Sequence, residues 1–137
     1  MGLKFAIAPK PGRPRNPFEA WADIQVIANT GETGLETSPD GLRTGRNSGY
    51  AAINLAVHLG AARILLLGYD MGVGPKGESH FDGFKQASPP YAQFRDKFQA
   101  LVKPLAELGV EVMNCSRQTA LTTFPRLELA QALGGAS

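Results

Sequence analysis

Three apolar runs in the sequence end abruptly in polar residues or glycine, and this pattern constrains the fold more than any other feature. The runs span residues 24–28, 63–67 and 110–113, and they are followed by Asn29-Thr30-Gly31, Gly68-Tyr69-Asp70 and Asn114-Cys115-Ser116. Strands of a parallel sheet that are buried on both faces give continuous apolar runs of this kind. A shorter run at residues 3–8 is a further strand candidate.

The first and second runs are separated by a helical pattern. Asn47-Ser48-Gly49 precedes an apolar segment, residues 50–59, which Gly60 closes. Asn and Ser are preferred N-terminal caps, and glycine is common just past a helix end, so we expect a buried helix here. Its polar stripe of Asn47, Asn54 and His58 is interpreted as the solvent-facing edge of the helix.

A second helical pattern lies between the second and third runs. Residues 91–108 carry apolar side chains at spacings of three and four, which predicts an amphipathic helix that ends at Gly109. Pro104 inside this segment predicts a kink or a break. A short last helix is expected after Pro125.

The alternation of strands and helices predicts an α/β fold. Right-handed crossovers then give a Rossmann-like three-layer sandwich, with a small, mostly parallel sheet and helices on both of its faces. Residues 1–23 are interpreted as a basic, proline-rich leader with a candidate first strand, and residues 24–137 as a single domain. Residues 31–46 and 71–88 form two long loops, a length that in a small domain favours a functional role.

Composition and charge narrow the classes of partner. Four of the 14 basic residues fall in the first 17 positions, at Lys4, Lys10, Arg13 and Arg15, but no aromatic residues interleave with them, so nucleic-acid binding is not expected. No apolar stretch reaches the length of a membrane helix, so no membrane partner is expected. The single cysteine, Cys115, excludes an intrachain disulfide and favours a cytoplasmic location.

Candidate ligand-binding residues follow from the rule that ligands bind beyond the carboxyl ends of parallel strands. The unpaired N–H groups at a helix start suit a phosphate, although the same residues also fit an ordinary capped helix. No dinucleotide-binding or Walker-type glycine pattern is present. The candidates are Asn29, Thr30, Tyr69, Asn114 and Arg117 after the strands, and Gly45, Arg46, Asn47, Ser48 and Gly49 at the first helix.

Two further residues are candidates for chemistry. Asp70 ends an apolar strand, where a carboxylate could hold a ribose hydroxyl, a Mg²⁺ ion or an attacking hydroxyl, or simply cap a turn. His80 lies in a glycine-rich loop, where a general base on a closing segment could sit, or an exposed histidine. Together with His58 and Asp82 they lack the spacing of a metal site, and no metal site is expected.

The residues around the first predicted helix resemble those of a known protein family. Thr44 to Tyr50, Ala52 to Ala56, Leu59 to Ala61 and Ile64 to Met71 resemble small phage and prophage proteins of the 6-hydroxymethylpterin diphosphokinase MptE-like type. These proteins are in turn similar to bacterial family 42 sialyltransferases. The later Ser79-His80-Phe81 and Asn114-Cys115-Ser116 fit as well, and the match covers about residues 29 to 133.

The resemblance implies a Rossmann-like fold that binds a nucleotide at the strand ends. In the sialyltransferase-like branch it implies that Ser48 and Gly49 contact the nucleotide and that His80 is a general base without a metal. In the diphosphokinase branch it implies a nucleoside triphosphate with Mg²⁺, and Asp70 as the carboxylate on the metal side. No other cofactor is implied.

The relatives begin with a glycine-rich strand, turn and helix, whereas this chain has only residues 4–8 and the leader before Asn29. We therefore expect a homo-oligomer that completes the site, or binding without turnover. The expected function is a phage-type nucleotide-binding protein, related to nucleotide-sugar or diphosphate transferases, in the cytoplasm of a bacterial host cell. The alternative is non-catalytic sequestration of a nucleotide-derived host immune signal by a homo-oligomer.

Overall fold

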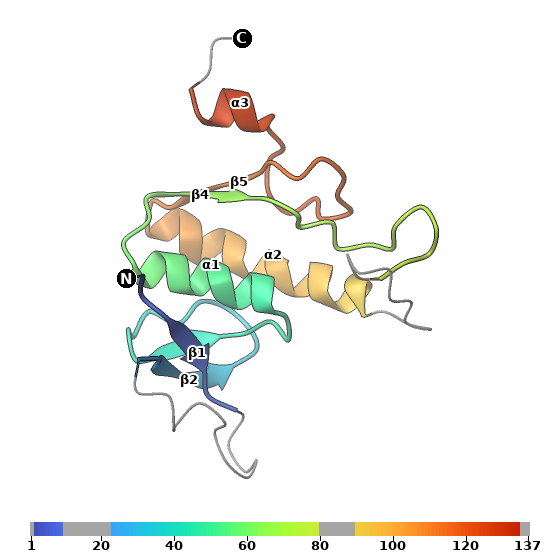
Figure 1. The fold of residues 1–137 in the computed structure, drawn as a ribbon. Coiled ribbons are helices and arrows are strands. Elements are labelled where there is room, and N and C mark those ends of the chain that lie inside the picture. The colour runs from blue at the N-terminus through green and yellow to red at the C-terminus, as the bar shows by residue number, and fades with distance from the viewer. Residues whose placement is uncertain (1, 10–22, 80–89, 135–137) are drawn as a thin grey trace.

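Five short strands and three helices make up the described part of the chain, residues 2–9, 23–79 and 90–134, in this computed structural model (Figure 1). In chain order they are β1 (Phe5–Ile7), β2 (Gln25–Gly31), β3 (Gly41–Arg43), α1 (Ser48–His58), β4 (Arg63–Leu66), α2 (Tyr91–Glu107), β5 (Glu111–Asn114) and α3 (Leu129–Ala132). Every strand pairing among them is parallel. The expected α/β fold with parallel strands is confirmed, and the strands form two small sheets where one was expected.

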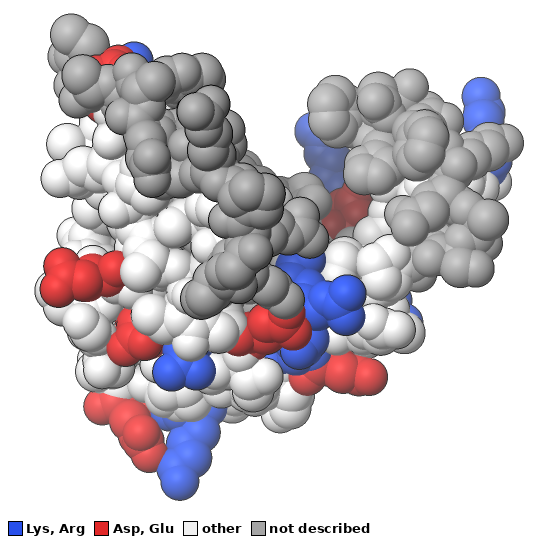
Figure 2. Space-filling model, turned by 90° about the horizontal axis from the view of Figure 1, so that it is seen from below, with Lys and Arg blue, Asp and Glu red and all other residues white. Residues whose placement is uncertain are grey.

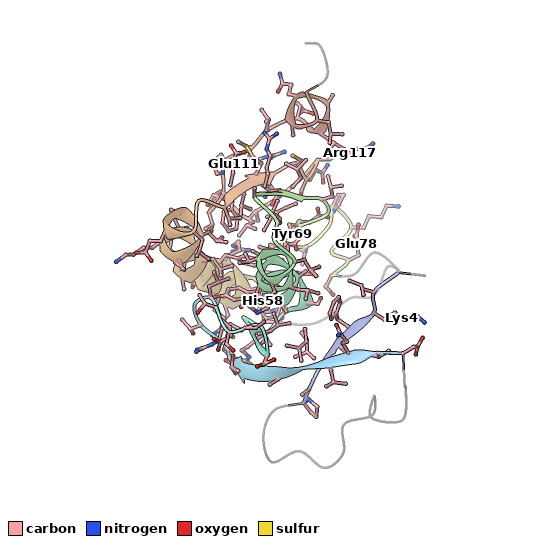
Figure 3. All side chains as sticks on the ribbon, turned by 90° about the vertical axis from the view of Figure 1, so that its left-hand side faces the viewer. Lys4, His58, Tyr69, Glu78, Glu111 and Arg117 are labelled. Carbon is pink, nitrogen blue, oxygen red and sulfur yellow. The ribbon has the colours of Figure 1, made fainter. Side chains whose placement is uncertain are left out.

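The strands divide into two sheets with helices between them. One sheet has the order β1-β2-β3 and the other has the order β4-β5. Helices α1 and α2 form a layer between the two sheets, as Figures 1 and 3 both show. The carboxyl ends of β2 and β4 therefore belong to different sheets, which matters for the candidate site.

Local signals account for both long helices. Asn47 caps α1, because its side-chain Oδ1 accepts a hydrogen bond from the Tyr50 N–H at 2.8 Å, and Gly60 follows the helix with a φ of 85°. Helix α2 ends at Glu107, just before Gly109, whose φ is 69°. Helix α2 continues through Pro104, so the expected break does not occur, although the Pro104 nitrogen cannot donate the backbone hydrogen bond of this turn.

The core forms where α2 packs against α1 and the β4–β5 sheet. The ring of Phe98, which is fully buried, lies 5.4 Å from the Tyr50 ring and 6.2 Å from the rings of Tyr69 and Phe124 (centroid distances). The cluster also contains Ile53, Leu66, Leu101, Leu105, Val112 and Leu121. This apolar layer fixes the start of α1 relative to the end of β4.

Asn54 and His58, two of the three residues of the polar stripe on α1, face the segment that contains β3 rather than solvent, so their interpretation as a solvent-facing edge was wrong. Asn54 is fully buried, its Oδ1 accepts hydrogen bonds from the N–H groups of Glu36 (2.9 Å) and Arg43 (3.1 Å), and its Nδ2 donates to the Glu36 carbonyl (2.9 Å). His58 Nε2 donates to the Gly41 carbonyl at 2.7 Å. These bonds satisfy the open edge of β3, which explains why polar residues stand on a buried helix face.

Strand β3 falls inside the loop predicted for residues 31–46. It is only three residues long, and its pairing with β2 depends on a segment ten residues away in the chain. The candidate strand at residues 3–8 does form, as β1. In the described part of the chain, none of the helices has the length and apolar character needed to span a bilayer.

Candidate functional site

A cavity of about 820 Å³ opens where the start of α1, the loop after β4 and the start of α2 meet. Its walls include Asn47, Ser48 and Gly49 from α1, Asp70, Met71, Lys76 and Glu78 from the loop, and Tyr91 and Phe94 from α2. This volume falls within the range typical of small-molecule sites. Of the sequence-predicted residues, the cavity brings together the helix start and Asp70.

Two residues at the start of α1 line this cavity and have unpartnered backbone N–H groups. Among its first four N–H groups, that of Tyr50 bonds to the Asn47 side chain and that of Ala51 to the Asn47 carbonyl, at 2.8 and 3.4 Å. The N–H groups of Ser48 and Gly49 have no partner in the described chain, and both residues line the cavity. The positive end of the helix dipole adds to their attraction for an anion.

A tight left-handed turn leads into the helix. Gly45 and Arg46 have φ values of 53° and 62°. A Cβ at Gly45 would lie 2.3 Å from the Tyr50 ring, so only glycine fits there. The Arg46 side chain is exposed, and neither Gly45 nor Arg46 lines the cavity.

Tyr69 joins the start of α1 to the end of β4 and does not line the cavity. Its hydroxyl donates to the Gly49 carbonyl at 2.9 Å, and a Cβ at Gly49 would lie 2.9 Å from its ring. Its backbone carbonyl accepts a hydrogen bond from the Thr119 hydroxyl at 2.5 Å. Burial raises the pKa of Tyr69 above its ordinary value, so its hydroxyl keeps its proton and remains a donor.

Asp70 is exposed at the cavity, and its carboxylate has no hydrogen-bond partner in the described chain. Its backbone is held, because its carbonyl accepts the Ala120 N–H at 2.7 Å. The next residue, Met71, has a φ of 49°, and its carbonyl accepts a hydrogen bond from Arg95 Nη1 at 2.7 Å. The loop is therefore anchored on both sides of a free carboxylate.

The loop beyond Met71 closes on itself. The Gly74 N–H donates to the Glu78 carbonyl at 2.8 Å, and the Lys76 N–H donates to Glu78 Oε2 at 2.8 Å. A Cβ at Gly74 would lie 2.3 Å from the Glu78 carboxylate. Glu78, labelled on this loop in Figure 3, thus uses its carboxylate for loop structure, whereas that of Asp70 remains available.

Sequence reasoning missed Lys76, Glu78, Tyr91 and Phe94. Lys76 and Glu78 lie in the long loop predicted for residues 71–88, where no sequence motif singles them out. Tyr91 and Phe94 have the spacing of a buried helix face, and they are half-buried at the cavity instead. That spacing is the same for a core contact and for a cavity wall, so only the fold distinguishes the two.

Asn114 and Arg117 lie outside the cavity. Asn114 is fully buried, its Nδ2 donates to Thr119 Oγ1 (3.1 Å) and to the Leu121 carbonyl (3.2 Å), and its Oδ1 accepts the Ser116 N–H (3.1 Å). It shapes the loop after β5. Arg117 is exposed and lies toward α3 in Figure 3.

Asn29 and Thr30 also lie outside the cavity, because β2 belongs to the other sheet. Asn29 Oδ1 accepts the Gly31 N–H at 3.2 Å, and the Thr30 hydroxyl donates to the Leu42 carbonyl at 3.1 Å. Both side chains therefore stabilise the end of β2. His80 and Asp82 lie outside the described residues.

Charges on the described surface are mixed rather than separated by sign. The face in Figure 2 shows Lys and Arg side chains interspersed with Asp and Glu. Ion pairs such as Arg63 with Glu111 (2.8 Å) and Lys97 with Glu32 (3.6 Å) contribute to this pattern. Within residues 2–9, 23–79 and 90–134, no three His, Cys, Asp or Glu side chains gather as a metal site would require.

Comparison of the chain with protein-family models, with curated proteins and with solved structures finds no match. The geometry of the cavity is therefore the main support for a function. Its two characteristic features are the free N–H groups at the start of α1 and the free carboxylate of Asp70.

Proposed function

We propose that this chain binds a nucleotide-type small molecule in the cavity, with a phosphate group at the start of α1. The observation that carries this proposal is the pair of unpartnered N–H groups, of Ser48 and Gly49, on the wall of a cavity of about 820 Å³. Free N–H groups at a helix N-terminus attract phosphates through hydrogen bonds and through the helix dipole. The cavity volume accommodates a nucleotide.

The other cavity residues suit the remaining parts of a nucleotide. The free carboxylate of Asp70 is a hydrogen-bond acceptor, which fits a ribose hydroxyl and repels a phosphate. The rings of Tyr91 and Phe94 offer an apolar wall for a base. This division assigns the phosphate to α1 and the sugar to the loop after β4.

The sequence resemblance supports the same assignment. In the sialyltransferase-like branch of the phage MptE-like proteins, a Ser-Gly helix start contacts the nucleotide, and Ser48 and Gly49 have that position here. If the ligand is a nucleoside triphosphate, Mg²⁺ fits Asp70, because this ion is often held by one carboxylate and the phosphates of the ligand. The ion would then offset the repulsion between the carboxylate and the phosphates.

The phosphate assignment is tested by the substitution Ser48→Pro. Ser48 is the first residue of α1, where proline is well tolerated, so this variant loses one cavity N–H while the helix remains. We expect the dissociation constant for bound nucleotides to rise about tenfold or more, measured by calorimetry with nucleoside mono-, di- and triphosphates and nucleotide sugars. The control Ser48→Ala, which keeps the N–H, stays within about threefold. Equal affinity in both variants contradicts the proposal.

Turnover distinguishes the two functions that share this site. A transferase with His80 as general base loses most activity in His80→Ala while nucleotide binding is kept. Sequestration predicts a ligand that is bound tightly, recovered unchanged and insensitive to His80→Ala. Mass spectrometry of small molecules released from the purified, denatured protein identifies the ligand and shows whether it has been cleaved.

A further inference from the structure

Among the described residues, strand β4 pairs with another strand on one side only. On that side, the Glu111 N–H donates to the Ala62 carbonyl at 3.0 Å and the Cys115 N–H donates to the Leu66 carbonyl at 2.9 Å. With the register Ile64↔Val112, the even-numbered residues of β4 thus bond to β5. The N–H and carbonyl groups of Arg63, Leu65 and Leu67 must therefore point to the opposite side.

These groups have no backbone partner within the described chain. The outer edges of β5 and β3, in contrast, are covered by other parts of the chain. The outer side of β5 pairs with the segment around Arg126, where the Asn114 N–H donates to the Pro125 carbonyl at 2.8 Å, and β3 is covered by the side chains of α1. An uncovered strand edge is a template for pairing with another strand.

The edge of β4 also lacks the residues that normally protect such edges. It contains no proline and no lysine between Ala62 and Leu67. Its one charge, Arg63, is already engaged, because Arg63 Nε lies 2.8 Å from Glu111 Oε2 and Nη1 donates to the Ala132 carbonyl at 2.7 Å. Leu67 at the end of the strand is 57% exposed. The edge of β4 is therefore mainly apolar, and it lacks the residues that normally prevent pairing with another strand.

We propose that the occupant of this edge is a second copy of the same chain, paired antiparallel with β4 about Leu65. This register places Leu65 opposite Leu65 of the partner subunit and Arg63 opposite Leu67 of the partner subunit. All three edge-facing residues of each copy then exchange hydrogen bonds, and no like charges face each other. The two β4–β5 pairs join into one four-stranded sheet.

A second copy fits better than an unrelated strand because the edge is self-complementary. A two-fold axis at Leu65 matches the apolar residues Ile64, Leu65 and Leu66 with themselves, as an isologous interface requires. A two-stranded sheet is marginal by itself, and four strands give it a more usual size. The pairing of two β4 strands does not require a ligand in the cavity.

The first test compares the oligomeric state of wild type and two variants by sedimentation velocity. Leu65→Pro removes the N–H at the centre of the edge but no bond to β5, and Leu65→Ala is its control, which keeps that N–H. We expect a dimer for wild type and Leu65→Ala, and a monomer for Leu65→Pro. A wild-type monomer at about 100 μM overturns the proposal, as does a folded dimer of Leu65→Pro.

A second pair of variants decides the matter if Leu65→Pro does not fold. Leu67→Lys puts a positive charge opposite Arg63 of the partner subunit, and Leu59→Lys changes a leucine of matched exposure, 58%, at the end of α1. We expect the dimer dissociation constant to rise at least about tenfold for Leu67→Lys only. Equal effects of both substitutions overturn the assignment to β4.

Cross-linking tests the register directly. Directly opposed residues of a hydrogen-bonded antiparallel pair have Cα atoms about 5.5 Å apart, a separation that a disulfide can bridge. In a Cys115→Ala background, Leu65→Cys is expected to give a covalent dimer on mild oxidation, and Leu59→Cys is not. A dimer in which Leu65→Cys remains uncross-linked overturns this register.

Discussion

The two ends of α1 use polar groups in opposite ways. At its start, the N–H groups of Ser48 and Gly49 are free and line the cavity. Farther along, Asn54 and His58 make hydrogen bonds that close the edge of β3. In Figure 3, His58 lies toward the β1–β2–β3 sheet, and Tyr69, which bonds to Gly49 at the start of α1, lies toward the β4–β5 sheet. Along α1, the polar side chains that are satisfied within the chain support the fold, and the two unpartnered N–H groups belong to residues that line the candidate site.

The largest effect on stability is expected from Asn54→Ala. This substitution leaves the N–H groups of Glu36 and Arg43 and the Glu36 carbonyl without their partner inside the protein. Buried groups left unpaired are costly, so the free energy of unfolding should fall by about 3–5 kcal/mol, measured by urea denaturation. Ser48→Ala, at the exposed start of the same helix, should change it by about 0.5 kcal/mol or less. If the free energy of unfolding falls by less than about 1 kcal/mol in Asn54→Ala, the hydrogen bonds of Asn54 to Glu36 and Arg43 do not stabilise the fold as expected.

Helix-end signals in the sequence predicted the bounds of α1, because they act on residues close by in the chain. The cap at Asn47 and the glycine at position 60 define α1, because each acts within a few residues of the helix end. The helix start predicted Ser48 and Gly49 as site residues, the end of an apolar run predicted Asp70, and the structure brings these three residues together at one cavity.

Contacts between segments that lie far apart in the chain could not be predicted from such local signals. The two sheets separate Asn29 and Thr30 from Asp70, although all three follow apolar runs. The burial of Asn54 depends on β3, a strand too short to show a period in the sequence. A polar residue on an apolar helix fits a solvent edge as well as a buried strand cap, so the sequence pattern does not distinguish them.

A moderate effect is expected at the junction between the two ends, where Tyr69 holds the start of α1. Tyr69→Phe removes the bond to the Gly49 carbonyl and should cost about 1 kcal/mol at neutral pH. It should also change the pH dependence. Burial raises the folded-state pKa of Tyr69 above its unfolded value of about 10, so stability is fully present below that pH and is lost as the pH rises through the folded pKa.

Unfolding free energies measured between neutral pH and pH 11 test this expectation. In wild type they should fall at the alkaline end, and in Tyr69→Phe the fall should be smaller. It should not vanish, because burial also raises the pKa of Tyr50. Identical pH profiles for wild type and variant would contradict a buried, protonated Tyr69 at this junction.

The smallest effect on stability is expected from Asp70→Asn at the open end. The Asp70 carboxylate has no partner in the described chain, so the free energy of unfolding should change by about 0.5 kcal/mol or less. Ligand binding should respond in two directions. Nucleotide affinity should fall by about threefold to tenfold, because an amide is a weaker acceptor for a ribose hydroxyl, while affinity for inorganic phosphate should rise as repulsion is removed.

The opposite signs are the informative part of this experiment. If Asp70 contacts only phosphate, the substitution strengthens binding of both probes, and if it lies away from the ligand, neither affinity changes. Asp96→Asn, on the exposed side of α2 and away from the cavity, provides the matched control and should change neither affinity. Weaker nucleotide binding combined with stronger phosphate binding therefore requires a ligand that reaches from the free N–H groups of α1 to the carboxylate after β4.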